Sequence, residues 1–305
     1  MTWRSGVKFL FERGAVLSGL PRLFRFRVRG DLLILAYHNI VPAGTSAAGD
    51  RSLHLGQDQF GAQLDLLLET HDVVSLAEAL ERADRGRSRP RAVLTFDDAY
   101  RGAVTAGVGE VVARSLAATI FVAPAFVGGH SFWWDVLSNP ADDGPGDALR
   151  SRALHELRGE DVRVRQWAAG IGRAAHPVPD HARCATIEEL TQVAREPGIT
   201  FGSHSWGHPN LARLTDAELA RELGQSLRWL RDRFANVIPY ISYPYGLSSA
   251  AVEQAARDAG YRAGLRIDGG WVREPLANRF AVPRLNVPAG LSRDGFAMRA
   301  AGLLR

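Results

Sequence analysis

The stretch Ala92–Phe96 (AVLTF), followed at once by Asp97-Asp98, decides the fold. A short apolar run rich in branched and aromatic residues predicts a strand that is buried on both faces. Parallel α/β proteins place functional side chains at the carboxyl ends of such strands. Neighbouring side chains on an extended backbone point in different directions, so the two acids need not do the same work. The alternative for this pair is a helix N-cap.

Similar apolar runs recur along the chain and alternate with helical patterns. They predict strands at 32–37, 73–74, 118–123, 199–203, 239–243, 261–265 and 280–287. Apolar residues at helical spacing predict helices at 58–70, 75–83, 215–234 and 249–259, and the third begins with a Thr215–Glu218 capping box. This alternation implies an α/β fold with a mostly parallel sheet. The number of units favours a closed or nearly closed barrel over an open sheet.

The chain divides into four parts by pattern. Residues 31–290 form the predicted barrel, and the irregular stretch 124–198 is interpreted as an insertion over one end of it. Residues 1–30 are predicted to form a basic helical segment, and 291–305 a tail. Residues 1–29 contain no signal-peptide or membrane-spanning run, which favours a cytoplasmic protein. A basic amphipathic helix lying on a membrane surface is the alternative for this segment.

Composition excludes several classes of function. The net charge is +4, yet the basic residues are spread along the chain and are nearly all arginine, so nucleic-acid binding is not expected. Cys184 is the only cysteine, which excludes an internal disulfide and a cysteine-based zinc site. No glycine-rich phosphate-binding motif follows a strand.

A second polar group, Ser203–Pro209 (SHSWGHP), also follows a predicted strand. Its two histidines, His204 and His208, are four residues apart and can converge on a metal ion. Such a pair arises often by chance, but two imidazoles and a carboxylate at strand ends match a common catalytic metal set. Two weaker signals are Ile241–Gly246 (ISYPYG), which on its own is a Pro/Gly turn, and the lone His38 after the first strand.

Taken together, T-F-D-D, S-H-S-W-G-H-P and S-Y-P-Y-G resemble, in this order, the first three motifs of the polysaccharide deacetylase family, the NodB-homology carbohydrate esterases. The resemblance runs from about residue 32 to 287. It implies a distorted (β/α) barrel of about seven strands that hydrolyses acetyl groups on sugars. It also implies that Asp97 is the base and that one divalent cation is held by Asp98, His204 and His208. Zn²⁺ suits this ligand set best, and Co²⁺, Ni²⁺ or Fe²⁺ would also fit.

The sequence departs from the family pattern at two places. Ser242 stands where the third motif usually has an arginine, and Arg284 is the candidate substitute. The family usually places its catalytic-acid histidine late in the chain, but no histidine follows His208. The Tyr37-His38 pair resembles a branch in which that motif is permuted to the front, so His38 is expected to be the acid.

These observations predict a hydrolase that removes acetyl groups from the N-acetylated sugars of a polysaccharide or glycan precursor. By resemblance, the backbone N–H of Tyr245 would meet the oxyanion, with Pro244 beside it and Arg284 completing the site. Trp206 is a candidate for stacking on a sugar, although a packing role is at least as common for such a residue. The alternatives are an O-acetyl esterase, a small-amide hydrolase on the same site, and a catalytically silent carbohydrate-binding barrel. The sequence predicts no oligomeric state.

Overall fold

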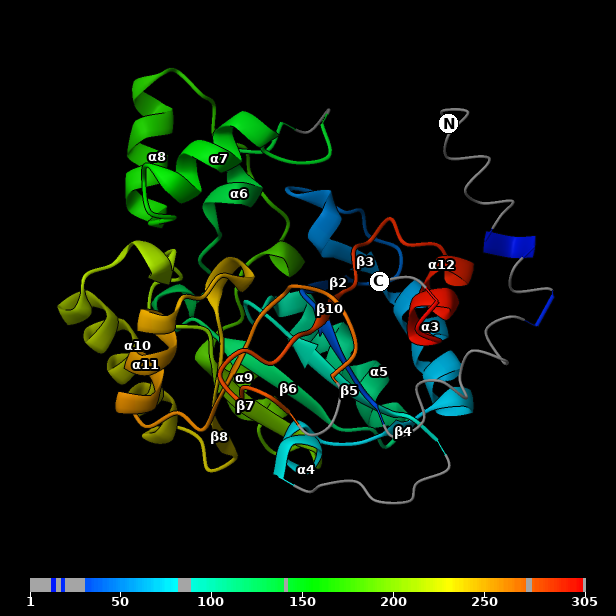
Figure 1. The fold of residues 1–305 in the computed structure, drawn as a ribbon. Helices are drawn as coiled ribbons and strands as arrows, with labels where there is room; N and C mark the ends of the chain where they lie inside the picture. The colour runs from blue at the N-terminus through cyan, green and yellow to red at the C-terminus, as the bar shows by residue number, and fades with distance from the viewer. Residues whose placement is uncertain are drawn as a thin grey trace.

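The protein folds around a curled parallel sheet, with helices outside it (Figure 1). The computed structural model describes residues 12–14, 18–19, 31–81, 89–139, 142–272 and 276–303. Eight strands form the main sheet: β1 Leu32–Tyr37, β4 Asp72–Val73, β5 Arg91–Phe96, β6 Ala118–Val122, β7 Ile199–Ser203, β8 Val237–Ser242, β9 Ala263–Leu265 and β10 Leu285–Asn286. Strands β1, β5 and β6 are buried along their whole length, as their apolar sequences predict.

The strands of the main sheet are arranged so that the two ends of the sheet meet. Neighbours run β10-β1-β5-β6-β7-β8-β9, and the short β4 pairs with the beginning of β5. Val282 forms a parallel bridge with Leu265 of β9, and the same segment then pairs with β1 as β10. The segment 282–286 therefore joins the last strand of the path to the first. The predicted distorted barrel of about seven strands is confirmed.

Helices cover the outside of this sheet. They are α3 Gln57–Thr70, α4 Leu76–Glu81, α5 Val108–Ala113, α9 Ile187–Val193, α10 Asp216–Arg231, α11 Ala250–Asp258 and α12 Arg293–Ala300, with a π-helical turn at Ala103–Gly107. Helix α10 begins at the predicted capping box, where Thr215 accepts a hydrogen bond from the backbone of Glu218. Its leucine face is buried against the sheet, and burial of each such side chain stabilises the fold by roughly 1.5–3 kcal/mol.

The irregular stretch 124–198 contains more helix than its sequence pattern indicates. It carries α6 Trp133–Val136, α7 Asp147–His155 and α8 Asp161–Gly170, in addition to α9. In Figure 1 the helices α6, α7 and α8 lie together beyond one end of the sheet. The aromatic residues of α6 are buried, with Trp133 1% and Trp134 4% exposed. This part of the chain therefore packs onto the barrel.

Several predicted boundaries differ from the structure. Of the strand predicted at 280–287, only Leu285–Asn286 is regular, because this segment divides its backbone pairing between β9 and β1. The predicted tail contains α12, which lies beside α3. A small parallel pair, β2 Asn39–Val41 with β3 His54–Gly56, was not predicted because both strands have only three residues. Most of the predicted helical segment 1–30 lies outside the described residues. Within the described residues, no helix is long and apolar enough to span a membrane.

Candidate metal and catalytic site

The candidate residues lie at one end of the sheet, where four strands terminate. Tyr37 and Phe96 are paired in register, and Asp97 N donates to Tyr37 O at 2.9 Å, so His38 and Asp97 follow neighbouring strands at the same level. On the other side of β6, His204 directly follows β7, and its backbone N–H bonds to Val122 O of β6 at 2.8 Å. The parallel sheet thus brings together motifs that are far apart in sequence.

Asp98, His204 and His208 form a compact and buried triangle. The Nε2 atoms of the two histidines are 3.1 Å apart. Asp98 Oδ1 lies 3.5 Å from Nε2 of His204 and 3.3 Å from Nε2 of His208. The three residues are between 2% and 4% exposed. Among the described residues, these three side chains are the ones close enough together to hold a metal ion.

The spacing and the chemistry of this triangle both fit a divalent cation. Tetrahedral zinc with ligand bonds of about 2.0–2.1 Å requires ligand atoms about 3.3 Å apart, close to the observed edges. His204 Nδ1 donates to Ser242 O at 2.6 Å, and because a carbonyl only accepts, the proton lies on Nδ1 and leaves Nε2 free to bind a metal. Burial lowers the pKa of His204 to about 4, which keeps the ring neutral. Asp98 Oδ1 has no hydrogen-bond donor among the described residues.

The backbone around the triangle is held in an uncommon conformation. Asp98, Ser205, His208 and Tyr245 all have φ between 56° and 68°, the left-handed region that most side chains avoid. Such residues cost about 1–3 kcal/mol each and persist where the surrounding structure fixes them. Here Ser205 Oγ accepts a hydrogen bond from His208 N at 3.1 Å. The strain is concentrated at the strand ends that carry the candidate ligands.

Asp97 is bound by Arg284 rather than by the histidines of the triangle. The guanidinium donates Nη1 to Oδ1 at 2.8 Å and Nη2 to Oδ2 at 2.7 Å, a bidentate pair in which both side chains are 0% exposed. Ser242 Oγ accepts from Arg284 Nη2 at 2.6 Å and donates to Asp97 Oδ2 at 3.1 Å. Burial alone would raise the pKa of Asp97, but Arg284 and then His204 hold it well below its ordinary value.

The remaining predicted residues surround this centre. His38 is partly exposed and acts electrostatically on both Asp97 and Asp98. Pro244 is buried, and the ring of Tyr245 lies edge-on to His208 with centroids 4.6 Å apart. The Tyr245 hydroxyl accepts from Trp133 Nε1 at 3.1 Å and donates to Gly159 O at 3.0 Å. Both partners belong to the stretch 124–198, which therefore braces this wall of the site.

Trp206 belongs to the loop 204–209, here called the histidine loop, which carries the two candidate histidine ligands. Its backbone N–H and that of Gly207 both donate to Glu222 Oε2, at 3.0 Å and 2.8 Å. Glu222 belongs to α10 and was not singled out from the sequence, since one glutamate on an amphipathic helix gives no signal. It holds the backbone between His204 and His208 in place.

A second buried hydrogen-bond network lies near the site and was not predicted from the sequence. Asp135 accepts from Tyr100 Oη at 2.6 Å and from His54 Nε2 at 2.9 Å. Asn39, next to His38, approaches Nδ1 of His54 at 2.8 Å. Trp134 donates to the same Tyr100 hydroxyl at 2.8 Å and lies 5.0 Å from the His208 ring. These contacts join residues far apart in sequence, so no local motif predicts them.

The family model for polysaccharide deacetylases matches residues 84–264, which is more than half of the chain. The chain belongs to the polysaccharide deacetylase family. The resemblance carried by the three motifs is confirmed. Among curated relatives of the family, YxkH of Bacillus subtilis is 28% identical over 116 residues. That match covers 38% of this chain and only 41% of the relative's length.

Solved structures of deacetylases share the fold. The Streptococcus pyogenes deacetylase PplD, determined with acetate, superposes with a TM-score of 0.60 at 18% identity over 88% of this chain and 97% of its own. IcaB from Ammonifex degensii gives 0.61 at 15% identity over 90% and 97%. The de-N-acetylase from Aggregatibacter actinomycetemcomitans gives 0.61 at 13% identity over 88% and 99%. At these identities the similarity concerns the fold alone.

Proposed function

We propose that the protein is a metal-dependent hydrolase that removes acetyl groups from the N-acetylated sugars of a polysaccharide or glycan precursor. One observation carries this proposal: two imidazole nitrogens and a carboxylate oxygen face one another at 3.1–3.5 Å beside a second carboxylate with its own cationic partner. Family membership and the deacetylase fold support the same reaction.

In this proposal the two aspartates differ in role because they differ in partners. Asp98, His204 and His208 would hold a divalent cation, which when bound polarises the acetyl carbonyl and acidifies a water. Asp97 is kept ionised by Arg284 and accepts the proton of the attacking water. Arg284 and Ser242 fix the direction of the carboxylate, so its remaining lone pairs are oriented before substrate arrives.

The amide bond breaks only if the departing nitrogen receives a proton. His38 is assigned this step because it follows β1 at the level of Asp97 and is partly exposed, which allows it to exchange protons with solvent. The backbone N–H of Tyr245 is the proposed donor to the developing oxyanion. Water thus adds to the carbonyl carbon, the carbon–nitrogen bond breaks, and acetate and the free amine leave.

Acetate release from a panel of acetylated sugars, with and without a chelator, tests the proposal. The panel contains N-acetylglucosamine oligomers, an O-acetylated xylan and a small cyclic ureide. We expect release from the N-acetylated oligomers, loss of that release with chelator, and recovery on adding Zn²⁺.

The other outcomes assign the alternatives. Release from the xylan alone would make the protein an O-acetyl esterase. Release of product from the ureide alone would make it a small-amide hydrolase. A protein that binds oligomers and zinc but releases no acetate would contradict the proposed reaction.

A further inference from the structure

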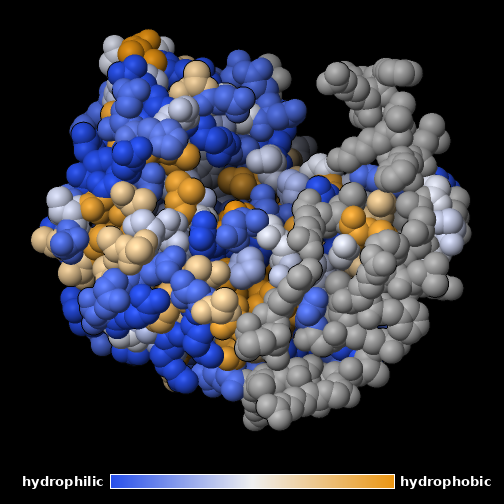
Figure 2. Space-filling model, viewed as in Figure 1, coloured by the Kyte–Doolittle hydropathy of each residue, from blue (hydrophilic) through white to orange (hydrophobic). Residues whose placement is uncertain are grey.

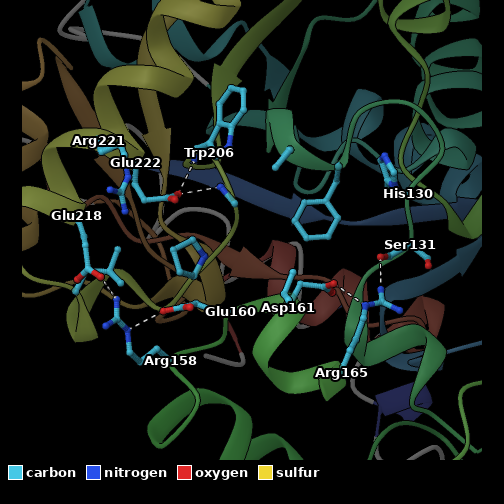
Figure 3. Close-up of a pocket in the computed structure, with 16 residues that line it drawn as sticks. His130, Ser131, Arg158, Glu160, Asp161, Arg165, Trp206, Glu218, Arg221 and Glu222 are labelled. Atoms are coloured by element: carbon cyan, nitrogen blue, oxygen red, sulfur yellow. Dashed lines mark hydrogen bonds and ion pairs between the residues drawn. The ribbon is translucent and has the colours of Figure 1, made fainter. Parts of the chain in front are cut away.

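A pocket lies beside the histidine loop and is lined by Trp206 and Gly207 of that loop (Figure 3). Its volume is about 660 Å³, within the usual range for a small-molecule site. Helix α8, helix α10 and the loop carrying Trp206 form its walls. None of the catalytic or metal-binding residues proposed above lines it.

The charges in this pocket are nearly balanced. Four carboxylates and three guanidiniums line it: Glu160, Asp161, Glu218, Glu222, Arg158, Arg165 and Arg221. Several of these pair with one another, since Arg158 contacts Glu160 at 2.8 Å and Glu218 at 2.7 Å. A polyanion or a polycation would meet unfavourable charges in such a pocket, so its chemistry favours a neutral polar ligand.

Some polar groups of the pocket remain available to a ligand. Asp161 Oδ1 is buried and has no hydrogen-bond partner among the described residues, although its other oxygen binds Arg165. Arg221 is exposed and makes no ion pair within the described part of the chain. The aromatic residue Trp206 also lines the pocket. Planar polar side chains beside an aromatic face suit a sugar, which has hydroxyl groups at its edge and C–H groups on its face.

Packed side chains form the wall between the pocket and the catalytic centre. Trp206, Gly207 and Pro209 line the pocket, whereas His208, in the same loop, faces the metal triangle. Phe126 also lines the pocket and stacks on Phe132 with centroids 4.2 Å apart. Phe132 stacks in turn on Trp134 at 4.5 Å, and Trp134 approaches the His208 ring at 5.0 Å. Three rings therefore separate the pocket from a candidate metal ligand.

We infer that this pocket is a second sugar-binding site, which holds a neutral N-acetylated residue of the same glycan whose acetyl group is removed at the metal triangle. The inference rests on the proposed function and deepens it, because it makes the substrate an oligomer rather than a single sugar. Binding in the pocket anchors the chain, so its contribution is seen in KM and grows with the length of the substrate.

The test compares N-acetylglucosamine with its pentamers, linked β-1,4 or β-1,6, in steady-state acetate release. Arg221→Ala and Asp161→Asn each remove a contact to the anchored sugar. We expect each to raise KM for the preferred pentamer about fivefold, with kcat and the KM for the monomer unchanged. Arg228→Ala is the matched control, because Arg228 is another exposed arginine of α10 that lies outside this pocket. Circular dichroism verifies the fold of each variant.

A second measurement separates this inference from the proposed reaction. Calorimetric titration of the metal-stripped protein with the pentamers needs no turnover. Binding that weakens about fivefold in Arg221→Ala and not in Arg228→Ala supports the pocket even if no acetate is ever released. The inference is overturned if the pentamers do not bind, or if the pocket variants change KM equally for monomer and pentamer or for neither.

Discussion

The two aspartates that follow β5 are adjacent in sequence and equally buried, yet their surroundings are opposite in kind. Asp97 is matched by Arg284 and Ser242, and its charge is balanced within the protein. Asp98 faces two imidazoles, and its Oδ1 has no donor among the described residues. The half of the site around Asp97 is therefore complete in the folded chain, while the geometry of the half around Asp98 fits a cation.

The largest expected effect is on kcat and comes from removing the charge of Asp97. Asp97→Asn should lower kcat by about 10²–10⁴, because the amide cannot accept the proton of the attacking water. Zinc content, measured by atomic absorption, should stay at the parental level, since the triangle is intact. Asp98→Asn is the matched control, and it should lose the metal together with the activity. An Asp97→Asn enzyme as active as the parent would remove Asp97 from its proposed role.

Arg284→Met should cost about 3–5 kcal/mol of unfolding free energy, because it leaves the charge of Asp97 buried without a partner. Urea denaturation of the metal-stripped protein measures this directly. The double variant with Asp97→Asn tests the cause, since the penalty of the second substitution should shrink when the first has already removed the charge. Additive losses would show that the two side chains do not act as a pair.

A smaller effect on stability should come from binding a cation at the triangle of Asp98, His204 and His208. Zn²⁺ at a hundredfold excess over its Kd should raise the unfolding free energy by about 2.7 kcal/mol, because the folded triangle binds it and the unfolded chain does not. His208→Ala should lose most of this gain, whereas Asp97→Asn should keep it. Denaturation curves with Zn²⁺ and with chelator provide the measurement, and an undiminished gain in His208→Ala would place the cation elsewhere.

Much of the barrel could be predicted because its strands are continuous apolar runs. Residues 32–37 and 199–203 are strands with the predicted boundaries, since both are buried except at Thr200 and both are followed by a polar histidine. The helices of 124–198 were less visible because they are short and partly exposed. Val162 of α8, for example, is 65% exposed, so the apolar residues of that helix do not mark a single buried face.

The candidate site was predictable as far as its motifs are local. Asp98, His204 and His208 meet because parallel strands bring their carboxyl ends to one edge, which the order of the motifs indicates. Arg284 was proposed as the substitute for the motif arginine only through the family resemblance, and its contact with Asp97 spans 187 residues. The contact of Asp135 with His54, which spans 81 residues, was not predicted. Pairings of this kind depend on ring closure and on the packing of the inserted helices, which no local pattern encodes.

The position of Arg284 on the closing segment has a consequence for how the protein is made. Ribosomal synthesis supplies Asp97 early, but its counter-ion emerges almost two hundred residues later. Until then, burying that carboxylate carries an uncompensated charge, which disfavours premature collapse of the catalytic end. A shortened product that ends before residue 284 would lack this counter-ion, and therefore should neither settle into the compact barrel nor cut its substrate.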